Sequence, residues 1–221
     1  MTLCLEARTV SDQTRRWHPA AVLLDLDGTL VDSERAVMRA WQWAAIALQV
    51  PFEAVDPFTH GIPVDQALTL SAPHVDEGER RRIGFEILLR QADPSVPVVL
   101  LPGAGSLMTH LAGSQWGIVT SGDLQLARSS MSKAGVPQPP VLVTADDVTQ
   151  GKPHPEPFIL AAELLGVPPE DCLVIEDSPA GIQAGKEAGM QVVAVATSHD
   201  SWRLDHADQI IRSLEYISPC G

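Results

Sequence analysis

The chain has 221 residues, of which 45% are hydrophobic, and its formal net charge at pH 7 is -13. This length and apolar content are enough for one domain, or for one domain with an insert. The negative charge argues against nucleic acids and anionic membranes as partners. No apolar span approaches the ~18 residues expected of a transmembrane helix. An anionic substrate would therefore need a local positive site.

Residues 1–19 lack the long apolar segment of a signal peptide, and we expect them to form a weakly ordered N-terminal extension. The three cysteines, Cys4, Cys172 and Cys220, are an odd number and do not have metal-ligand spacing. This cysteine usage favours a reducing, cytoplasmic compartment and no zinc site.

The segment 25–29 reads Asp-Leu-Asp-Gly-Thr and follows the apolar residues 20–24, which we expect to form a buried strand. A buried carboxylate is costly unless it is paired or metal-bound, so Asp25 and Asp27 favour chemistry over packing. Because they are two residues apart on an extended chain, their side chains would project to one side, and Gly28 lets the backbone turn away. The alternative is a strand end followed by a helix-capping loop.

Residues 33–101 are expected to form an inserted helical cap domain. Ser33 is placed to cap a first helix with an apolar stripe, and further helices are expected over 65–70 and 77–92. Trp41 lies on that stripe, so we expect it in the core of the insert or at its interface. The alternative for Trp41 is an aromatic shelf for the substrate.

After residue 100, short β-rich runs alternate with amphipathic segments, a pattern typical of a parallel sheet with helices on both faces. We expect strands over 116–120, 141–144, 172–176 and 191–196, separated by helices over 124–134, 155–165 and 180–188. The predicted fold class is therefore α/β, with a Rossmann-like parallel sheet flanked by helices. Its core would comprise residues 20–32 and 102–221.

Polar residues stand at the carboxyl ends of the predicted strands or in the loops after them: Asp25, Asp27, Thr120, Lys152, Glu176 and Asp177. In an open parallel sheet these ends face one crevice, where ligands bind. Lys152 follows Thr120 by 32 residues and Asp177 follows Lys152 by 25, near the ~30 of a βαβ unit. The 95 residues between Asp25 and Thr120 leave about 65 for the insert.

These motifs resemble, in order, the four motifs of the haloacid dehalogenase-like (HAD) phosphatase superfamily. They are 25–29, Thr-Ser-Gly at 120–122, Gly-Lys-Pro at 151–153 and Glu-Asp-Ser-Pro-Ala-Gly at 176–181. The resemblance covers the chain from about residue 20 to its end, and the insert stands where that family places a small helical cap. Segments 143–148, 151–157 and 60–61 look like the branch that hydrolyses glycerol phosphate, 2-deoxyglucose 6-phosphate and related polyol or sugar phosphates.

The hydrolysis of a phosphomonoester needs a nucleophile, a proton donor for the leaving oxygen and neutralisation of the phosphate charge. Asp25 would attack phosphorus and become an aspartyl phosphate, while Asp27 would protonate the leaving oxygen and then activate water. Thr120 would donate its hydroxyl to the phosphoryl group. The backbone N–H groups of Ser121 and Gly122 would assist it.

The repulsion between these carboxylates and a phosphate predicts a hard dication, and Mg2+ suits oxygen ligands. Asp25 and Asp177 would be side-chain ligands, together with the carbonyl of Asp27, and Glu176 would bind the ion or one of its waters. A helix N-cap pair is the alternative for Glu176 and Asp177. Lys152 would bind a phosphate oxygen and the carboxylate of Asp25. The alternative interpretation is that Lys152 is an exposed lysine in a loop.

His60 would reach substrate hydroxyls from the cap, or hydrogen-bond within a surface turn. We expect a small phosphorylated metabolite as partner, and a monomer or weak homodimer. A sugar phosphomutase of the same superfamily is an alternative, but similar mutases carry a histidine and an arginine where Val37 and Val64 stand. Asp27 argues against a hydrolytic dehalogenase. The last alternative is a non-catalytic phosphometabolite-binding protein, which would be expected to lack a catalytic residue.

Overall fold

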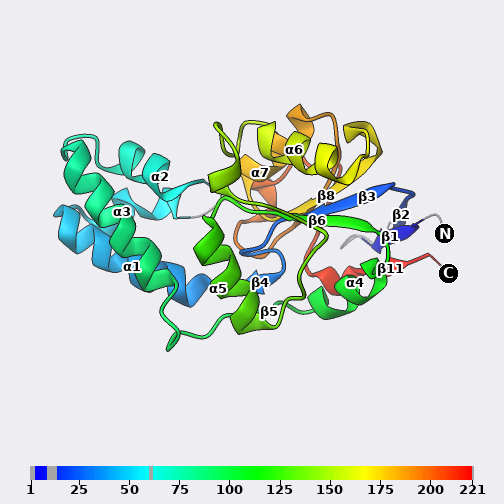
Figure 1. Cartoon of the computed structure of the whole chain (residues 1–221), viewed down its shortest axis with the longest axis horizontal. Helices are drawn as coiled ribbons and strands as arrows, with labels where there is room; N and C mark the ends of the chain where they lie inside the picture. The colour runs from blue at the N-terminus through cyan, green and yellow to red at the C-terminus, as the bar shows by residue number, and fades with distance from the viewer. Residues whose placement is uncertain (1–2, 9–13, 60–61, 221) are drawn as a thin grey trace.

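The computed structural model describes residues 3–8, 14–59 and 62–220. Its central layer is a parallel sheet of six strands in the order β10-β9-β8-β3-β6-β7 (Figure 1). The strands are β3 (Ala21–Leu24), β6 (Gln115–Val119), β7 (Val141–Val143), β8 (Cys172–Glu176), β9 (Gln191–Val195) and β10 (Gln209–Ile211). The predicted α/β class and its parallel sheet are confirmed. Strand β10 was not predicted.

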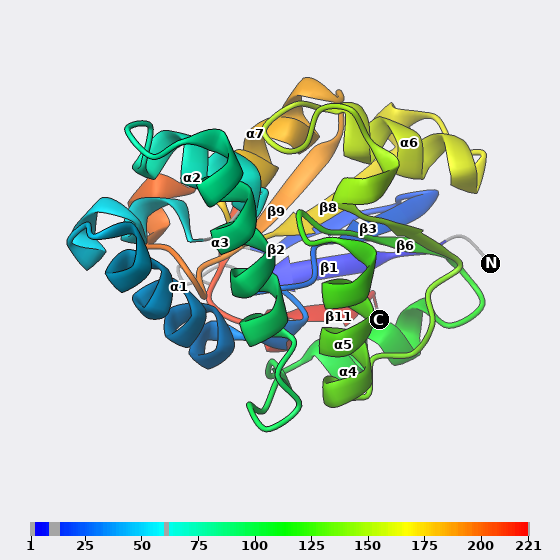
Figure 2. The ribbon, with the colours of Figure 1, turned by 60° about the vertical axis from the view of Figure 1, so that its left-hand side comes forward.

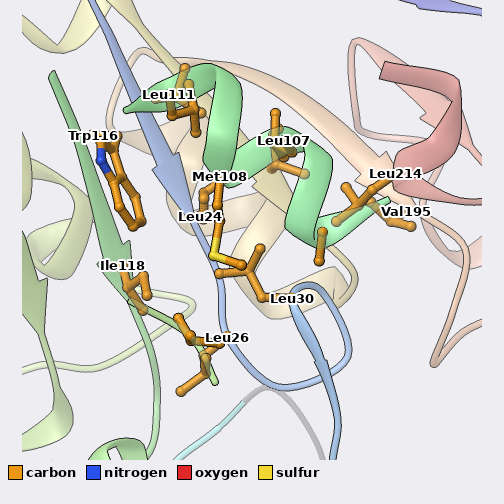
Figure 3. Packing of buried hydrophobic residues seen from close by; sticks show 14 of the residues in the cluster. Leu24, Leu26, Leu30, Leu107, Met108, Leu111, Trp116, Ile118, Val195 and Leu214 are labelled. Carbon is orange, nitrogen blue, oxygen red and sulfur yellow. The ribbon is translucent and has the colours of Figure 1, made fainter. Parts of the chain in front are cut away.

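Helices cover both faces of this sheet, which explains why the residues of the central strand β3 are all buried. One face packs against α4 (Ala104–Leu111) and α5 (Leu124–Ala134), the other against α6 (Glu156–Leu165) and α7 (Pro179–Glu187). In Figure 3, Leu107, Met108 and Leu111 of α4 lie over Leu24 and Trp116 of the sheet. In the parts of the chain that the structure describes, no helix is both long and apolar enough to cross a membrane.

The predicted helical insert consists of α1 (Glu34–Leu48), α2 (Val64–Ser71) and α3 (Glu77–Gln91), with short 3-10 turns at Phe52–Ala54 and Asp56–Phe58. These helices lie at one end of the molecule around their own buried cluster, which includes Trp41 and Ile83 (Figures 1 and 2). The apolar stripe expected for the first helix therefore packs against buried residues of the third. Trp41 belongs to this core, as expected.

A two-stranded ribbon joins the three-helix segment to the sheet domain: β4 (Val31–Asp32) pairs antiparallel with β5 (Val99–Leu100). Ser33 occupies the N-cap position of α1, as expected, but its side chain makes no capping hydrogen bond. The side chain of Asp32 accepts the hydrogen bond from the N–H of Glu34 at 3.1 Å, and Ser33 has φ -107° and ψ 3°, outside the extended conformation of a typical N-cap residue.

The N-terminal segment differs from the weakly ordered extension expected for residues 1–19. Strands β1 (Leu5–Arg8) and β2 (Thr14–Trp17) form a three-stranded antiparallel sheet with β11 (Ile217–Pro219). Leu5, Ala7 and Trp17 are buried in the same cluster as helix α4. The burial of these apolar side chains stabilises the segment.

Cys4 and Cys220 form a disulfide that joins the start of the chain to its end, while Cys172 is buried and free. This pairing runs against the reducing compartment inferred from the odd number of cysteines. An odd count does not exclude a disulfide, because one cysteine can remain buried as a small apolar side chain.

Candidate functional site

A crevice of about 700 Å³ lies between the carboxyl ends of the sheet strands and the three-helix segment. Its floor includes the predicted site residues Asp25, Asp27, Thr120, Ser121, Gly122 and Asp177. Asp25 and Asp27 follow β3, the Thr-Ser-Gly turn follows β6, and Asp177 follows β8. The parallel sheet thus brings these segments together, as the positions of the polar residues predicted.

Lys152 lies beneath this floor in the centre of a buried hydrogen-bonded group. Its ammonium donates to Asp25 Oδ1 at 2.6 Å, to Glu176 Oε1 at 2.9 Å and to the carbonyl of Val119 at 2.9 Å. The residue is only 1% exposed, so the alternative of an exposed loop lysine is wrong. The ring of Phe158 lies under the ammonium, with its centroid 5.1 Å away.

Burial governs the electrostatics of this group. It raises the pKa of Asp25 to about 8, with Lys152 opposing and Glu176 adding to the shift. Burial also raises the pKa of Asp177 well above the usual range, and the carboxylates of Glu176 and Asp25 add to the effect. For Lys152, burial lowers the pKa, but the neighbouring carboxylates outweigh it and the net shift is upward. The lysine therefore stays charged, and burial favours the protonated forms of Asp25 and Asp177 unless another cation joins them.

The backbone and neighbouring side chains fix Asp177 in place. Thr29 Oγ1 donates to Asp177 Oδ1 at 3.3 Å, and His199 Nδ1 lies 3.2 Å from the Asp177 carbonyl oxygen. Gly28 has φ +86°, and a Cβ added there would collide with the carboxylate of Asp177 and the hydroxyl of Ser198. Gly28, which was predicted to let the chain turn, is thus also required because the Asp177 carboxylate and the Ser198 hydroxyl leave no room for a side chain there.

Glu176 is held from both sides. One of its carboxylate oxygens accepts from Lys152, and the other accepts from the backbone N–H groups of Asp177 and Ser178. The cap of helix α7 is Ser178, whose side chain accepts from the N–H of Gly181 at 3.1 Å. The alternative of Glu176 and Asp177 as an N-cap pair is therefore wrong.

The Thr120 side chain is buried beside the crevice, and its hydroxyl oxygen accepts from the N–H of Gly122 at 3.1 Å. This bond directs the N–H of Gly122 to the hydroxyl rather than to a phosphate. The hydroxyl keeps its own hydrogen for a further acceptor, which suits the donor role expected for Thr120. Ser121 and Gly122 also line the crevice.

The donor set fits a hard dication. Asp25, Glu176 and Asp177 offer carboxylate oxygens that all lie within 4.8 Å of one another, and all three residues are buried. Lys152 supplies one positive charge against three carboxyl groups, so a divalent cation would complete the neutralisation. Asp27 also lines the crevice, close enough for its charge to act on Asp25, and is only half-buried.

His60 and the adjacent glycine lie outside the described residues, so nothing here tests the expected contact of His60 with the substrate. Three residues that contact Asp177 or its carboxylate were not predicted from the sequence: Thr29, Ser198 and His199. Thr29 belongs to the first motif, which is the only sequence signal for its position near the site. Ser198 and His199 follow β9 without a pattern that distinguishes them from an ordinary loop.

Comparison with known proteins extends these observations. A family model described as haloacid dehalogenase-like hydrolase matches residues 19–189. The chain is 44% identical over 203 residues to hexitol phosphatase A of Escherichia coli (strain K12), covering 89% of this chain and 92% of the relative. It is 36% identical to the validoxylamine A 7'-phosphate phosphatase of Streptomyces hygroscopicus subsp. limoneus, covering 88% and 94%.

Solved structures show the same architecture. A hydrolase from Pseudomonas syringae superposes with a TM-score of 0.82 at 25% sequence identity, covering 90% of this chain and 95% of that structure.

Proposed function

Because the chain belongs to the haloacid dehalogenase-like hydrolases and is a phosphatase, we propose that it is a Mg2+-dependent hydrolase of small polyol or sugar phosphates. The observation that carries this proposal is the buried contact of Lys152 with Asp25 and Glu176 directly beneath the floor of the crevice, which Asp25 lines. The three N–H groups of Lys152 are donated to Asp25, Glu176 and the Val119 carbonyl, so the lysine would act on a phosphoryl group through its charge rather than through a hydrogen bond.

In the first step, Asp25 is the nucleophile. The Lys152 ammonium at 2.6 Å fixes the position of its carboxylate, so that one oxygen attacks phosphorus in line with the ester bond. The phosphorus–oxygen ester bond breaks as the new bond to Asp25 forms. Asp27 gives its proton to the departing oxygen, and its position on the crevice wall makes it accessible to that oxygen.

In the second step, Asp27 removes a proton from a water molecule, which attacks the phosphorus of the aspartyl phosphate. The bond to Asp25 breaks, the Asp25 carboxylate is restored and inorganic phosphate leaves. The Thr120 hydroxyl donates to a phosphoryl oxygen in both steps, since its hydrogen remains after it has accepted from Gly122.

Asp25 and Asp177 would hold Mg2+ through their side chains and Asp27 through its carbonyl, while Glu176 would bind the ion or one of its waters. When bound, the ion would neutralise the negative charge that an incoming phosphate meets.

The substrate class follows from the crevice and from the relatives. The three-helix segment forms one wall of the crevice, and we propose that it closes as a lid that admits small molecules and excludes phosphoproteins. The names of the relatives denote phosphatases of a hexitol, of glycerol 1-phosphate and of 2-deoxyglucose 6-phosphate. Val37 and Val64 line the crevice with apolar side chains, which favours hydrolysis over a mutase that must hold a second phosphate.

A phosphate-release screen tests the proposal. We expect the Mg2+-loaded protein to hydrolyse glycerol, erythritol and hexitol phosphates, and Asp25→Asn to lose activity by several orders of magnitude without forming a phosphoenzyme. Asp25→Asn nearly preserves shape, so its thermal unfolding serves as the control for folding. Substantial turnover by Asp25→Asn would reject the covalent step. Faster release of phosphate from phosphopeptides than from polyol phosphates would reject the lid.

A further inference from the structure

The loop that follows strand β9 contacts the candidate metal site through three consecutive residues, although it belongs to none of the four sequence motifs. Thr197 Oγ1 donates to the carbonyl of Gly28. The Ser198 hydroxyl is hydrogen-bonded to the carboxylate of Asp177, and His199 Nδ1 lies 3.2 Å from the Asp177 carbonyl oxygen. One short loop therefore joins the turn after β3 to the residue that follows β8.

The Asp177 carboxylate has a hydroxyl group beside each of its oxygens. Thr29 Oγ1 donates to Asp177 Oδ1 at 3.3 Å. A Cβ built on Gly28 would lie 2.1 Å from Asp177 Oδ2 and 2.4 Å from Ser198 Oγ, so these two oxygens share the space that the absent side chain leaves. Each carboxylate oxygen can accept from more than one partner. The two hydroxyls can therefore orient Asp177 while its carboxylate binds a cation.

The same loop helps to orient the carbonyl of Asp27, the proposed backbone ligand. The peptide after Asp27 is held at its other side, because the N–H of Gly28 donates to the Val31 carbonyl at 2.8 Å. In a trans peptide the C=O and N–H point in opposite directions, so this bond sets the direction of the Asp27 carbonyl. Thr197 holds the next peptide through the Gly28 carbonyl. It thereby opposes rotation of the backbone at Gly28, where φ is +86° and no side chain restricts it.

We propose that Thr197 and Ser198 are positioning residues for the divalent cation: they hold the Asp27 carbonyl and the Asp177 carboxylate in place for coordination and thereby set the affinity for Mg2+. This inference rests on the proposed function and deepens it. Residues that orient metal ligands without touching the ion contribute about 10–100-fold to metal affinity or activity. The loop also lines a separate cavity of about 640 Å³, where water can replace a lost hydroxyl in part. We therefore expect an effect at the lower end of this range.

The rise of Tm with Mg2+ concentration in the metal-free protein measures binding without a substrate. Thr197→Val and Ser198→Ala each remove one hydroxyl and change the volume little. We expect each to raise the Kd for Mg2+ about 10-fold, and to raise the Mg2+ concentration for half-maximal hydrolysis of p-nitrophenyl phosphate by the same factor. At saturating Mg2+, kcat should return to within about 3-fold of wild type, because both residues lie outside the crevice lining.

Ser201→Ala is the matched control, because Ser201 is an exposed serine of the same loop, at the start of the 3-10 turn Ser201–Arg203. This variant should keep the Kd of wild type. If folded Thr197→Val and Ser198→Ala bound Mg2+ as tightly as the control, the inference would be overturned and the proposed function would remain intact. A lower kcat at saturating Mg2+ with an unchanged Kd would overturn it as well. If wild type neither bound Mg2+ nor required it for hydrolysis, the proposed function itself would fail.

Discussion

Replacing Lys152 by Met should destabilise the metal-free protein strongly. The ammonium is bonded to Asp25 and Glu176 at 2.6 and 2.9 Å, and the side chain is 1% exposed. Met has a similar length but no charge, so the variant leaves buried carboxylates without their cation. Breaking a buried ion pair from one side costs ~3–5 kcal/mol. For a chain of this size, that corresponds to a fall in Tm of roughly 6–20 °C.

The loss of stability in the metal-free Lys152→Met variant should depend on pH. Burial holds the pKa of Asp25 at about 8 against a usual value of 3.8, so between these values the folded state binds more protons than the unfolded state. The metal-free wild type therefore loses stability as pH rises through this window. Without Lys152 the pKa of Asp25 would rise further, because the lysine opposes the effect of burial. Both folded proteins then keep this proton up to about pH 8, so the gap between the variant and wild type should stay constant below about pH 8 and widen above it.

Thermal unfolding in a chelator, with and without added Mg2+, measures these effects. Lys186→Met is the matched control, because Lys186 binds Asp208 at 2.8 Å while its side chain is 38% exposed, and such a pair contributes only ~0–1 kcal/mol. We expect Mg2+ to restore more stability to Lys152→Met than to wild type. If Lys152→Met unfolded at the same temperature as the control at every pH, the electrostatic account of the site would be refuted.

Three further predictions concern Asp27 as the proton donor, the disulfide between Cys4 and Cys220, and Gly28. Asp27→Asn should slow the hydrolysis of alkyl phosphates by ~10²–10⁴-fold. It should slow the hydrolysis of aryl phosphates less, because a phenolate leaves more easily without protonation. Equal losses in kcat for the two kinds of substrate would show that Asp27 is not the acid. Cys220→Ser should lower the free energy of unfolding by ~2–5 kcal/mol in urea titrations, because its disulfide links residues 216 positions apart; an unchanged urea midpoint would contradict this. Gly28→Ala should cost ~2–4 kcal/mol and most of the activity, because its Cβ would displace the Asp177 carboxylate. Gly113→Ala, at φ +83° with nothing within 4 Å, should cost only ~1 kcal/mol; equal thermal shifts for the two variants would show that backbone strain alone matters.

The sequence alone determined the parallel sheet and the positions of the site at its strand ends. Periodicity over 116–196 predicted strands and helices to within one or two residues of those observed, because each element buries its own apolar residues locally. The first motif and the Glu-Asp pair at the end of β8 stood out because carboxylates at buried strand ends are costly without a partner. Their catalytic roles remain predictions.

Only the tertiary structure decided which groups surround each carboxylate. Thr29 donates to the Asp177 carboxylate across 148 residues of sequence, and the Asp177 carbonyl meets the ring of His199 from a loop that carries no pattern. The N-terminal strands could not be predicted either, since β1 becomes a strand by pairing with β11 at the far end of the chain. The physical reason is common to these cases: a hydrogen bond between distant segments depends on where the rest of the fold places them, and local periodicity contains no record of that placement.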